Sequence, residues 1–254
     1  MKILFLSLIL LILASFLLKK RIVFFLAWIS FALYWLSEIP YYHSIGDYYN
    51  IFILLSASFL CIIMGKLSLR EVDDSLLFFT RVSATASSLY FIFLLVPALH
   101  DALIGALIKE IIIFSHLLGF SDVRWFGDSM VGIAGKPVKI IFACTGIESM
   151  VLFAGISLSS NGRISNRLLA FLVSVPVIYI LNIFRNIFVI VAYGYSWFGE
   201  ESFYVAHNVI AKLGATLALV AIAYAVLRLL PDVLEMIEKI WRRVREELWL
   251  LEKL

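Results

Sequence analysis

Long apolar stretches separated by short polar connections make up most of this chain. Seven of them approach or exceed the roughly 20 residues that a helix needs to cross a bilayer. They lie at residues 3–18, 22–39, 50–65, 82–100, 142–160, 168–196 and 207–230. Inside lipid a segment must satisfy its own backbone hydrogen bonds, so we expect helices. The pattern predicts an all-α polytopic membrane protein with about seven transmembrane helices, in which Pro97 and Pro176 are tolerable kinks.

Two stretches leave the number of spans open. Residues 101–120 are long enough to cross a membrane, but Lys109 and Glu110 lie at their middle. Each charge costs about 2.5–3.5 kcal/mol at that depth, so an outward amphipathic helix on the outer leaflet fits better. Residues 168–196 allow a break at NIFRN, which would move the basic C-terminal tail outside. We therefore expect one long helix there.

The segments between and after these helices give further predictions. Glycine turn signals and alternating apolar residues at 130–142 predict a short extracellular hairpin or loop before the Cys-bearing helix. Apolar residues spaced by three and four predict an amphipathic cytoplasmic tail helix at 231–254, either on the inner leaflet or in a short coiled coil. Three parts result: N-terminal transmembrane helices (1–81), a catalytic transmembrane core (82–230) and the tail (231–254).

Composition supports the membrane assignment. The chain is 63% hydrophobic and 15% charged, against roughly 45–50% and ~25% in soluble domains. A net charge of +3 is too small to indicate a nucleic-acid partner. Two cysteines are too few for a disulfide framework, and Cys61, inside an apolar run, is expected to be a core residue. The N-terminus resembles a signal peptide without a small-residue cleavage site, so we expect a retained first span.

Basic residues predict the orientation of the chain. Fourteen of the 21 fall in one alternate set of connections, which is therefore assigned to the cytoplasm of a multi-pass cell-membrane protein. They are Lys19, Lys20, Arg21, Lys66, Arg70, Arg81, Arg163, Arg167, Arg228, Lys239, Arg242, Arg243, Arg245 and Lys253. The N-terminus and the loops 40–49, 101–141 and 197–206 then face outward, and the C-terminus is cytoplasmic.

Three reactive side chains then share the extracytoplasmic face. Arg185 lies 18 residues after Arg167, or ~27 Å along a helix, near the outer edge of the hydrocarbon. Cys144 begins the preceding span and His207 the following one, both on the outer side. A thiol, a guanidinium and an imidazole supply a nucleophile, an anion stabiliser and a proton shuttle.

Neighbouring residues extend this candidate site. A helix start favours the Cys144 thiolate, and the free amides of Thr145 and Gly146 are possible oxyanion donors. Glu148 can pair with Arg185, orient His207, or form a purely structural ion pair. The other interpretations are inert packing for Cys144, an interfacial His207 and an Arg185 that reaches lipid phosphate. Cys144 and His207 lack a clear third ligand, so neither metal nor cofactor is expected.

Three motifs together resemble the exosortase/archaeosortase family over roughly residues 80–230. They are Ala143-Cys144-Thr145-Gly146-Ile147-Glu148-Ser149, Asn182-Ile183-Phe184-Arg185-Asn186 and His207-Asn208. Thr145 is closer to the archaeal branch, and the third position holds His207 where some branches have arginine.

The resemblance implies a polytopic cysteine transpeptidase. Its substrates are secreted proteins with a C-terminal tripartite signal: a short motif, an apolar span and a basic tail. The implied reaction passes through a thioester on Cys144 and ends in transfer to a lipid amine. Arg185 stabilises the oxyanion, and His207 serves both proton transfers. Asn182, Asn186 and Asn208 come with the motifs as possible supporting residues.

Two other functions remain open at this stage. A cysteine protease of the same architecture would release its product to water. A non-enzymatic anion transporter or binding protein would use Arg185 and Glu148 to grip its ligand. Transporters often show internal repeats, and we find none in this sequence.

Overall fold

The computed structural model describes residues 2–18, 20–133 and 135–251. Lys19 and Lys253, which enter the charge argument, and residues 252–254 of the predicted tail lie outside this part. The chain divides into two compact units. Unit 1 contains residues 1–88, 158–162 and 231–254, and unit 2 contains residues 89–157 and 163–230.

Unit 1 is built around two helices packed side by side, α2 (Arg21–Ser44) and α3 (Tyr48–Arg70). They are joined by α1 (Lys2–Ile12), with its π-helical end η1 (Leu13–Leu17), and by most of α4 (Asp74–Leu95). Its core contains Leu11, Phe24, Trp28, Cys61 and Leu76. Cys61 is buried there, as its apolar surroundings predict.

Ion pairs tie the tail helix α10 (Pro231–Leu251) to other residues of unit 1. The pairs join Arg243 to Asp73, and Glu247 to both Lys66 (2.6 Å) and Arg70 (3.0 Å). Glu247 is only 1% exposed, and two cations offset the cost of burying its charge. The structure has a helix where the tail helix was predicted, and its cytoplasmic place stays a prediction. Neither interpretation of the tail included these contacts within the chain.

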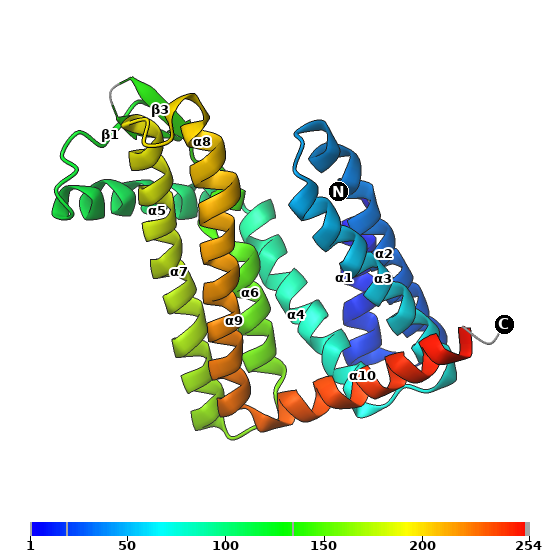
Figure 1. The fold of residues 1–254 in the computed structure, drawn as a ribbon. Helices are drawn as coiled ribbons and strands as arrows, with labels where there is room; N and C mark the ends of the chain where they lie inside the picture. Colours follow the sequence, from blue (N-terminus) through cyan, green and yellow to red (C-terminus); the bar gives the residue numbers. More distant parts are fainter. Residues whose placement is uncertain (1, 19, 134, 252–254) are drawn as a thin grey trace. The chain divides into compact units, whose positions relative to one another are not determined.

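Unit 2 combines helices with a small sheet (Figure 1). Its elements in chain order are α5 (Pro97–Leu117), β1 (Arg124–Trp125), β2 (Met130–Ile133), β3 (Lys136–Lys139), the 3₁₀ turn η2 (Phe142–Thr145), α6 (Ile147–Ser159), α7 (Ile164–Gly194), the 3₁₀ turn η3 (Gly199–Glu201), α8 (Ser202–Tyr204), the π-helical turn η4 (Val205–Ala211) and α9 (Lys212–Leu229).

The sheet confirms the predicted hairpin and adds a strand to it. Its order is β1-β2-β3, all antiparallel, with Met130 opposite Lys139 and Arg124 opposite Gly132. Strand β2 packs closely on the end of α7, where a Cβ on Gly194 would lie 2.7 Å from Cβ of Ile133. A side chain at that position would push the sheet away from the helix.

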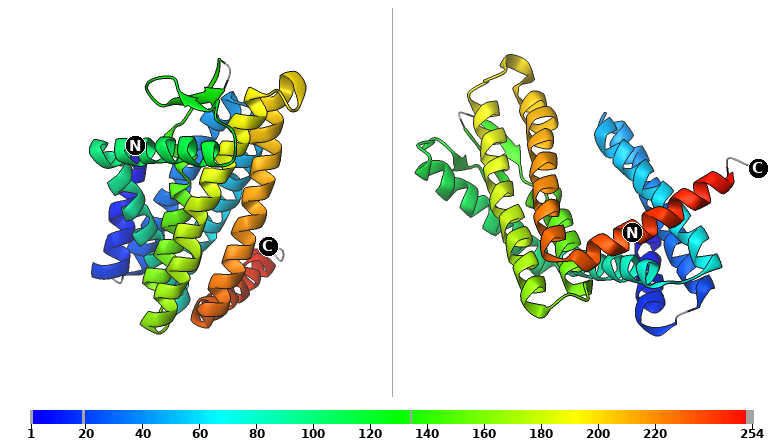
Figure 2. Two further views of the ribbon diagram at one scale, coloured as in Figure 1. Left: turned by 90° about the vertical axis from the view of Figure 1, so that its left-hand side faces the viewer. Right: turned by 60° about the horizontal axis from the view of Figure 1, so that its bottom comes forward.

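A hydrophobic core joins α5, the sheet and the second half of α7. It contains Ile104, Leu107, Ile108, Ile111, Val123, Val131, Ile133, Ile140, Ile183, Ile187, Ile190 and Val191. Figures 1 and 2 show α5 lying across α7 near the end that carries the sheet. Phe142 and Cys144 pack against this core. The core therefore positions the turn that carries the predicted nucleophile.

Five helical segments in the described part of the chain are long and apolar enough to cross a membrane. They are Arg21–Ser44, Tyr48–Arg70, Asp74–Leu95, Ile164–Gly194 and Gly199–Leu229. They correspond to five of the seven predicted spans. The other two match shorter apolar helices, Lys2–Leu17 and Ile147–Ser159, so the total of seven stays a prediction. The single long helix predicted across Arg185 is confirmed.

The predicted span at 82–100 was wrong at its second end. Helix α4 stops at Leu95, Val96 is extended, and Pro97 begins α5. A proline disfavours helical backbone at the residue before it but fits the first turn of a helix. Pro97 therefore separates two helices here, whereas Pro176 lies inside α7.

Helix α5 packs one of its faces into the core of unit 2. One face carries core residues such as Leu107 and Ile111, while Ile113 and Leu117 are exposed. Helix α5 is not among the five candidate spans of the described chain. Its place at the outer membrane surface stays a prediction.

Candidate functional site

The three predicted reactive residues belong to three elements of unit 2. Cys144 lies in η2, Arg185 in the second half of α7, and His207 in η4. Cys144 is partly buried and precedes α6 by a few residues, so it sits in the turn that feeds the helix. The predicted helix start at Cys144 is thus displaced to Ile147.

Two asparagines of α7 hold the backbone of Cys144. The side-chain amides of Asn182 and Asn186 donate to the Cys144 carbonyl oxygen at 2.7 and 3.0 Å. Both asparagines are 7% exposed, and they are one helical turn apart on the same face. We call this arrangement the amide clamp. It fixes the turn that carries Cys144 to the helix that carries Arg185.

The turn after Cys144 has little freedom. The Thr145 hydroxyl donates to the Phe142 carbonyl (2.7 Å) and accepts from the Ile147 amide (3.3 Å). Gly146 has φ +72°, in the left-handed region. A Cβ at Gly146 would lie 3.2 Å from Cγ of Asn182. The glycine therefore serves both the backbone conformation and the close approach of the amide clamp.

Gly146→Ala should reduce substrate processing at least about 10-fold more than a control substitution that introduces only the same backbone strain. The left-handed conformation alone costs an L residue about 1–2 kcal/mol. Gly46→Ala is the matched control, because Gly46 has φ +70° and open space around its Cβ position. Substrate processing per amount of folded protein is the measurement. Equal activity of the two variants would show that displacing Asn182 has no consequence.

The guanidinium of Arg185 is only partly hydrogen-bonded among the described residues. Its Nη1 donates to Oδ1 of Asn182 at 3.3 Å. Its Nε is buried and has no hydrogen-bond partner among the described residues. An unsatisfied buried donor is costly unless a ligand completes it. The guanidinium is thus suited to an anion that forms beside Cys144.

Burial and neighbouring groups shift the pKa of the Cys144 thiol in opposite directions. Burial raises the pKa of the Cys144 thiol, which lies ahead of α6, above its usual value. The Ile141 backbone hydrogen bond and the Arg185 charge lower this pKa, and Glu148 raises it. These surroundings therefore do not favour the thiolate that the expected helix start would favour. Arg185 also interacts electrostatically with Glu148, whereas a direct pairing of the two side chains stays a prediction.

His207 lies deeper in its helical run than expected. The buried Ser202 accepts a hydrogen bond from the Phe198 amide (3.0 Å) and starts α8 five residues before His207. The imidazole stacks on Phe203 at 5.3 Å, and its Nδ1 lies 3.3 Å from Oδ1 of Asn208. Turn η4 packs on α7, and π-turns often occur at functional sites. A meeting of His207 with Cys144 stays a prediction.

The motifs gave no indication of an aromatic contact on the Cys144 turn. Phe142 stacks on His100 of α5 (4.9 Å between ring centres) and meets Tyr90 of α4 edge-on (5.5 Å). His100 lies outside the three motifs, so the motifs assigned it no role. No group of three or more His, Cys, Asp or Glu suited to a metal occurs in the described part of the chain.

Known proteins show the same relationship that the motifs indicate. The family described as transmembrane exosortase (Exosortase_EpsH) matches residues 2–227. Archaeosortase A of Haloferax volcanii is 25% identical over 250 residues, covering 84% of this chain and 82% of that protein. Archaeosortase A of Natronomonas pharaonis is 26% identical over 249 residues, covering 84% and 77%. No solved structure matches this chain. With a family match over nearly its whole length, this chain belongs to the transmembrane exosortase family.

Proposed function

We propose that this protein is a membrane-embedded cysteine transpeptidase with Cys144, Arg185 and His207 as its reacting groups. The observation that supports it most is the free, buried Nε of Arg185 on the helix whose asparagines clamp Cys144. A donor held beside a nucleophile is what a tetrahedral oxyanion requires.

The first half of the reaction makes a thioester. His207 takes the proton of the Cys144 thiol, and the sulfur bonds to the scissile carbonyl carbon. The carbonyl oxygen becomes an oxyanion that Arg185 stabilises, with the amides of Thr145 and Gly146 as further donors. When the oxyanion collapses, the carbon–nitrogen bond breaks and the leaving amine takes the proton from His207. The downstream part of the signal then departs.

The second half transfers the acyl group. An amine attacks the thioester carbonyl, a carbon–nitrogen bond forms and the carbon–sulfur bond breaks. One amine proton passes to the leaving sulfur, which restores the Cys144 thiol. The substrate and acceptor come from the family resemblance. They are a secreted protein with a short motif, an apolar span and a basic tail at its C-terminus, and a membrane lipid amine. Asn208 beside His207, like the amide clamp, supports the reacting groups without changing covalently.

The chemical form of the product separates transfer from hydrolysis. We call a secreted protein of the same genome with an apolar C-terminal segment and a basic tail the signal-bearing substrate. The protein is reconstituted in vesicles that contain phosphatidylethanolamine, and the new C-terminus is analysed by mass spectrometry. We expect an amide-linked lipid. A free carboxylate would make the protein a protease that releases its product, and uncleaved substrate would exclude both enzymes.

The orientation of the site is a separate prediction. We propose that Cys144 opens to the extracytoplasmic side and that the C-terminus is cytoplasmic. The reason is that 14 of the 21 basic residues fall in the connections that include the C-terminal tail and exclude the Cys144 turn. A membrane-impermeant thiol reagent on intact cells should label Cys144 and spare the buried Cys61. A tag after Leu254 should resist external protease. Digestion of that tag in intact cells would reverse the topology.

A further inference from the structure

A histidine outside the proposed reacting groups is anchored to the turn that carries Cys144. His100, near the start of α5, stacks on Phe142 with ring planes 21° apart. Phe142 opens η2, two residues before Cys144, and Tyr90 contacts it as well. All of these residues belong to unit 2. The imidazole of His100 is therefore part of the frame that holds the nucleophile.

A carboxylate whose side chain is 80% exposed lies beside this imidazole. The Nδ1 of His100 lies 3.0 Å from Oδ1 of Asp101, the next residue. A base held by a carboxylate is the arrangement that hydrolases use for proton transfer. Two other histidines have different surroundings: His116 contacts the Val123 carbonyl at 2.8 Å, and His43 meets the Tyr48 ring in unit 1.

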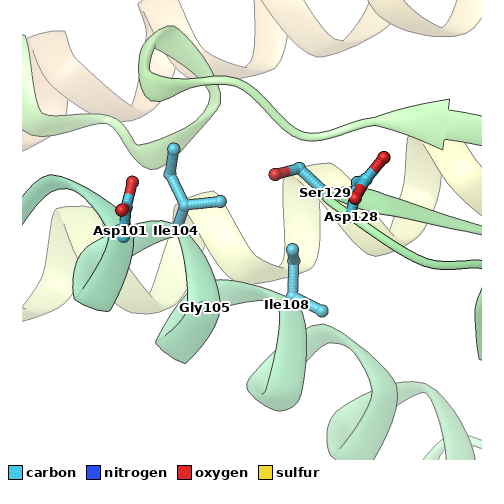
Figure 3. A pocket seen from close by; sticks show the side chains of 6 residues that line it. All are labelled: Asp101, Ile104, Gly105, Ile108, Asp128 and Ser129. Atoms are coloured by element: carbon cyan, nitrogen blue, oxygen red, sulfur yellow. The ribbon is translucent and has the colours of Figure 1, made fainter.

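The same carboxylate lines a cavity. The cavity has a volume of about 230 Å³ and lies between α5 and the connection from β1 to β2 (Figure 3). Its lining residues are Asp101, Ile104, Gly105, Ile108, Asp128 and Ser129. A water molecule occupies about 30 Å³ in the liquid, so there is room for a small amine head group. Apolar side chains on one wall and two carboxylates suit an alkylammonium.

We infer that this cavity admits the acceptor as a primary ammonium and that His100, oriented by Asp101, is the base for the second half-reaction. This inference rests on the proposed thioester at Cys144. His100 takes one proton from the ammonium, and the neutral amine bonds to the thioester carbonyl carbon. The carbon–sulfur bond breaks, sulfur keeps its electron pair, and the second amine proton goes to that sulfur. In this scheme His207 is the base for formation of the thioester, and His100 is the base for transfer of the acyl group to the amine.

Single-turnover kinetics separate the two histidines. The enzyme is mixed with signal-bearing substrate in phosphatidylethanolamine vesicles, and the Cys144-linked acyl group is followed by intact mass. His100→Gln should form the adduct within about 3-fold of the wild-type rate but lose it about 10²-fold more slowly, the smaller end of general-base effects. His207→Gln should slow adduct formation instead. His116→Gln, on the same helix, is the matched control and should change neither rate.

Hydroxylamine provides a rescue that a structural role for His100 would not give. This amine is largely unprotonated at neutral pH, so it needs no base and should clear the stalled adduct at similar rates from wild type and His100→Gln. Asp101→Asn keeps the imidazole and should slow transfer less than His100→Gln does. Comparison with vesicles of phosphatidylcholine, whose head group has no N–H, shows whether the lost step is aminolysis.

The inference and the proposed function fail in different ways. If His100→Gln clears its adduct at the wild-type rate, or loses adduct formation instead, His100 is not the base for transfer, and Cys144 keeps its role. If Cys144→Ala still processes the substrate, the thioester is absent and the inference falls with it. If hydroxylamine clears the variant's adduct no faster than phosphatidylethanolamine does, His100 has only a structural role.

Discussion

Replacing Cys144 with alanine should lower processing of the signal-bearing substrate by about 10⁴-fold or more, the scale seen when a hydrolase loses its nucleophile. The reason is the position of the thiol, which is partly exposed at the clamped turn and near Arg185, whose buried Nε has no hydrogen-bond partner among the described residues. The amide clamp bonds to the Cys144 carbonyl and not to its side chain, so alanine should leave the fold intact. Cleavage of the substrate in membranes that hold equal amounts of protein is the measurement.

Cys61→Ala is the internal control for this loss. Cys61 is buried among apolar side chains in the core of unit 1, and a cysteine buried in such a core is normally inert. We expect Cys61→Ala to retain most of the processing. If Cys144→Ala processes the substrate as Cys61→Ala does, the thiol mechanism is wrong.

Arg185→Lys should be nearly as damaging as Arg185→Ala, with a loss of about 10²–10³-fold in rate, the effect of removing one oxyanion donor elsewhere. Lysine keeps the positive charge but lacks the planar guanidinium. Only the guanidinium can donate to Asn182 and, from another nitrogen, to an anion at the same time. Turnover of a saturating substrate should fall more than its apparent affinity. The measurement is the rate of Cys144 adduct formation at equal protein level.

Arg167→Lys is the matched control on the same helix. Arg167 lies in the first turn of α7 and donates from Nε to the Ser157 carbonyl at 3.0 Å, away from Cys144. We expect this variant to stay within about 3-fold of wild type. Wild-type turnover in Arg185→Lys would mean that Arg185 merely holds a charge at the membrane surface, as its alternative interpretation has it.

Much of the fold could be predicted because a segment in lipid must form its backbone hydrogen bonds within its own helix. The long α7 and the hairpin β2–β3 followed from apolar length and turn residues. The break at Pro97 was missed, since a proline is compatible both with a kink in a span and with the first turn of a new helix. The contacts of α10 were missed because ion pairs such as Arg243 with Asp73 join residues 170 positions apart.

For the candidate site, the sequence suggested reacting groups, which stay a prediction, but not the contacts around them. Motif spacing indicated Cys144, Arg185 and His207 but not how Asn182 and Asn186 act, because their bonds to Cys144 cross 38 and 42 residues. The need for glycine at position 146 follows from a contact with Asn182 that forms only in the folded chain. His100 could have been noticed as a histidine followed by an aspartate, but its stacking on Phe142 depends on how α5 packs.

The central claim is that Cys144 carries the acyl group of the substrate during the reaction. The most direct test is to quench the reaction with acid, digest the protein and map the adduct by mass spectrometry. We predict that the N-terminal part of the signal-bearing substrate is attached to the peptide with Cys144, that hydroxylamine removes it, and that the peptide with Cys61 is unmodified. An adduct on another residue, or processing at full rate with an unmodified and alkylatable Cys144 throughout, would contradict the mechanism.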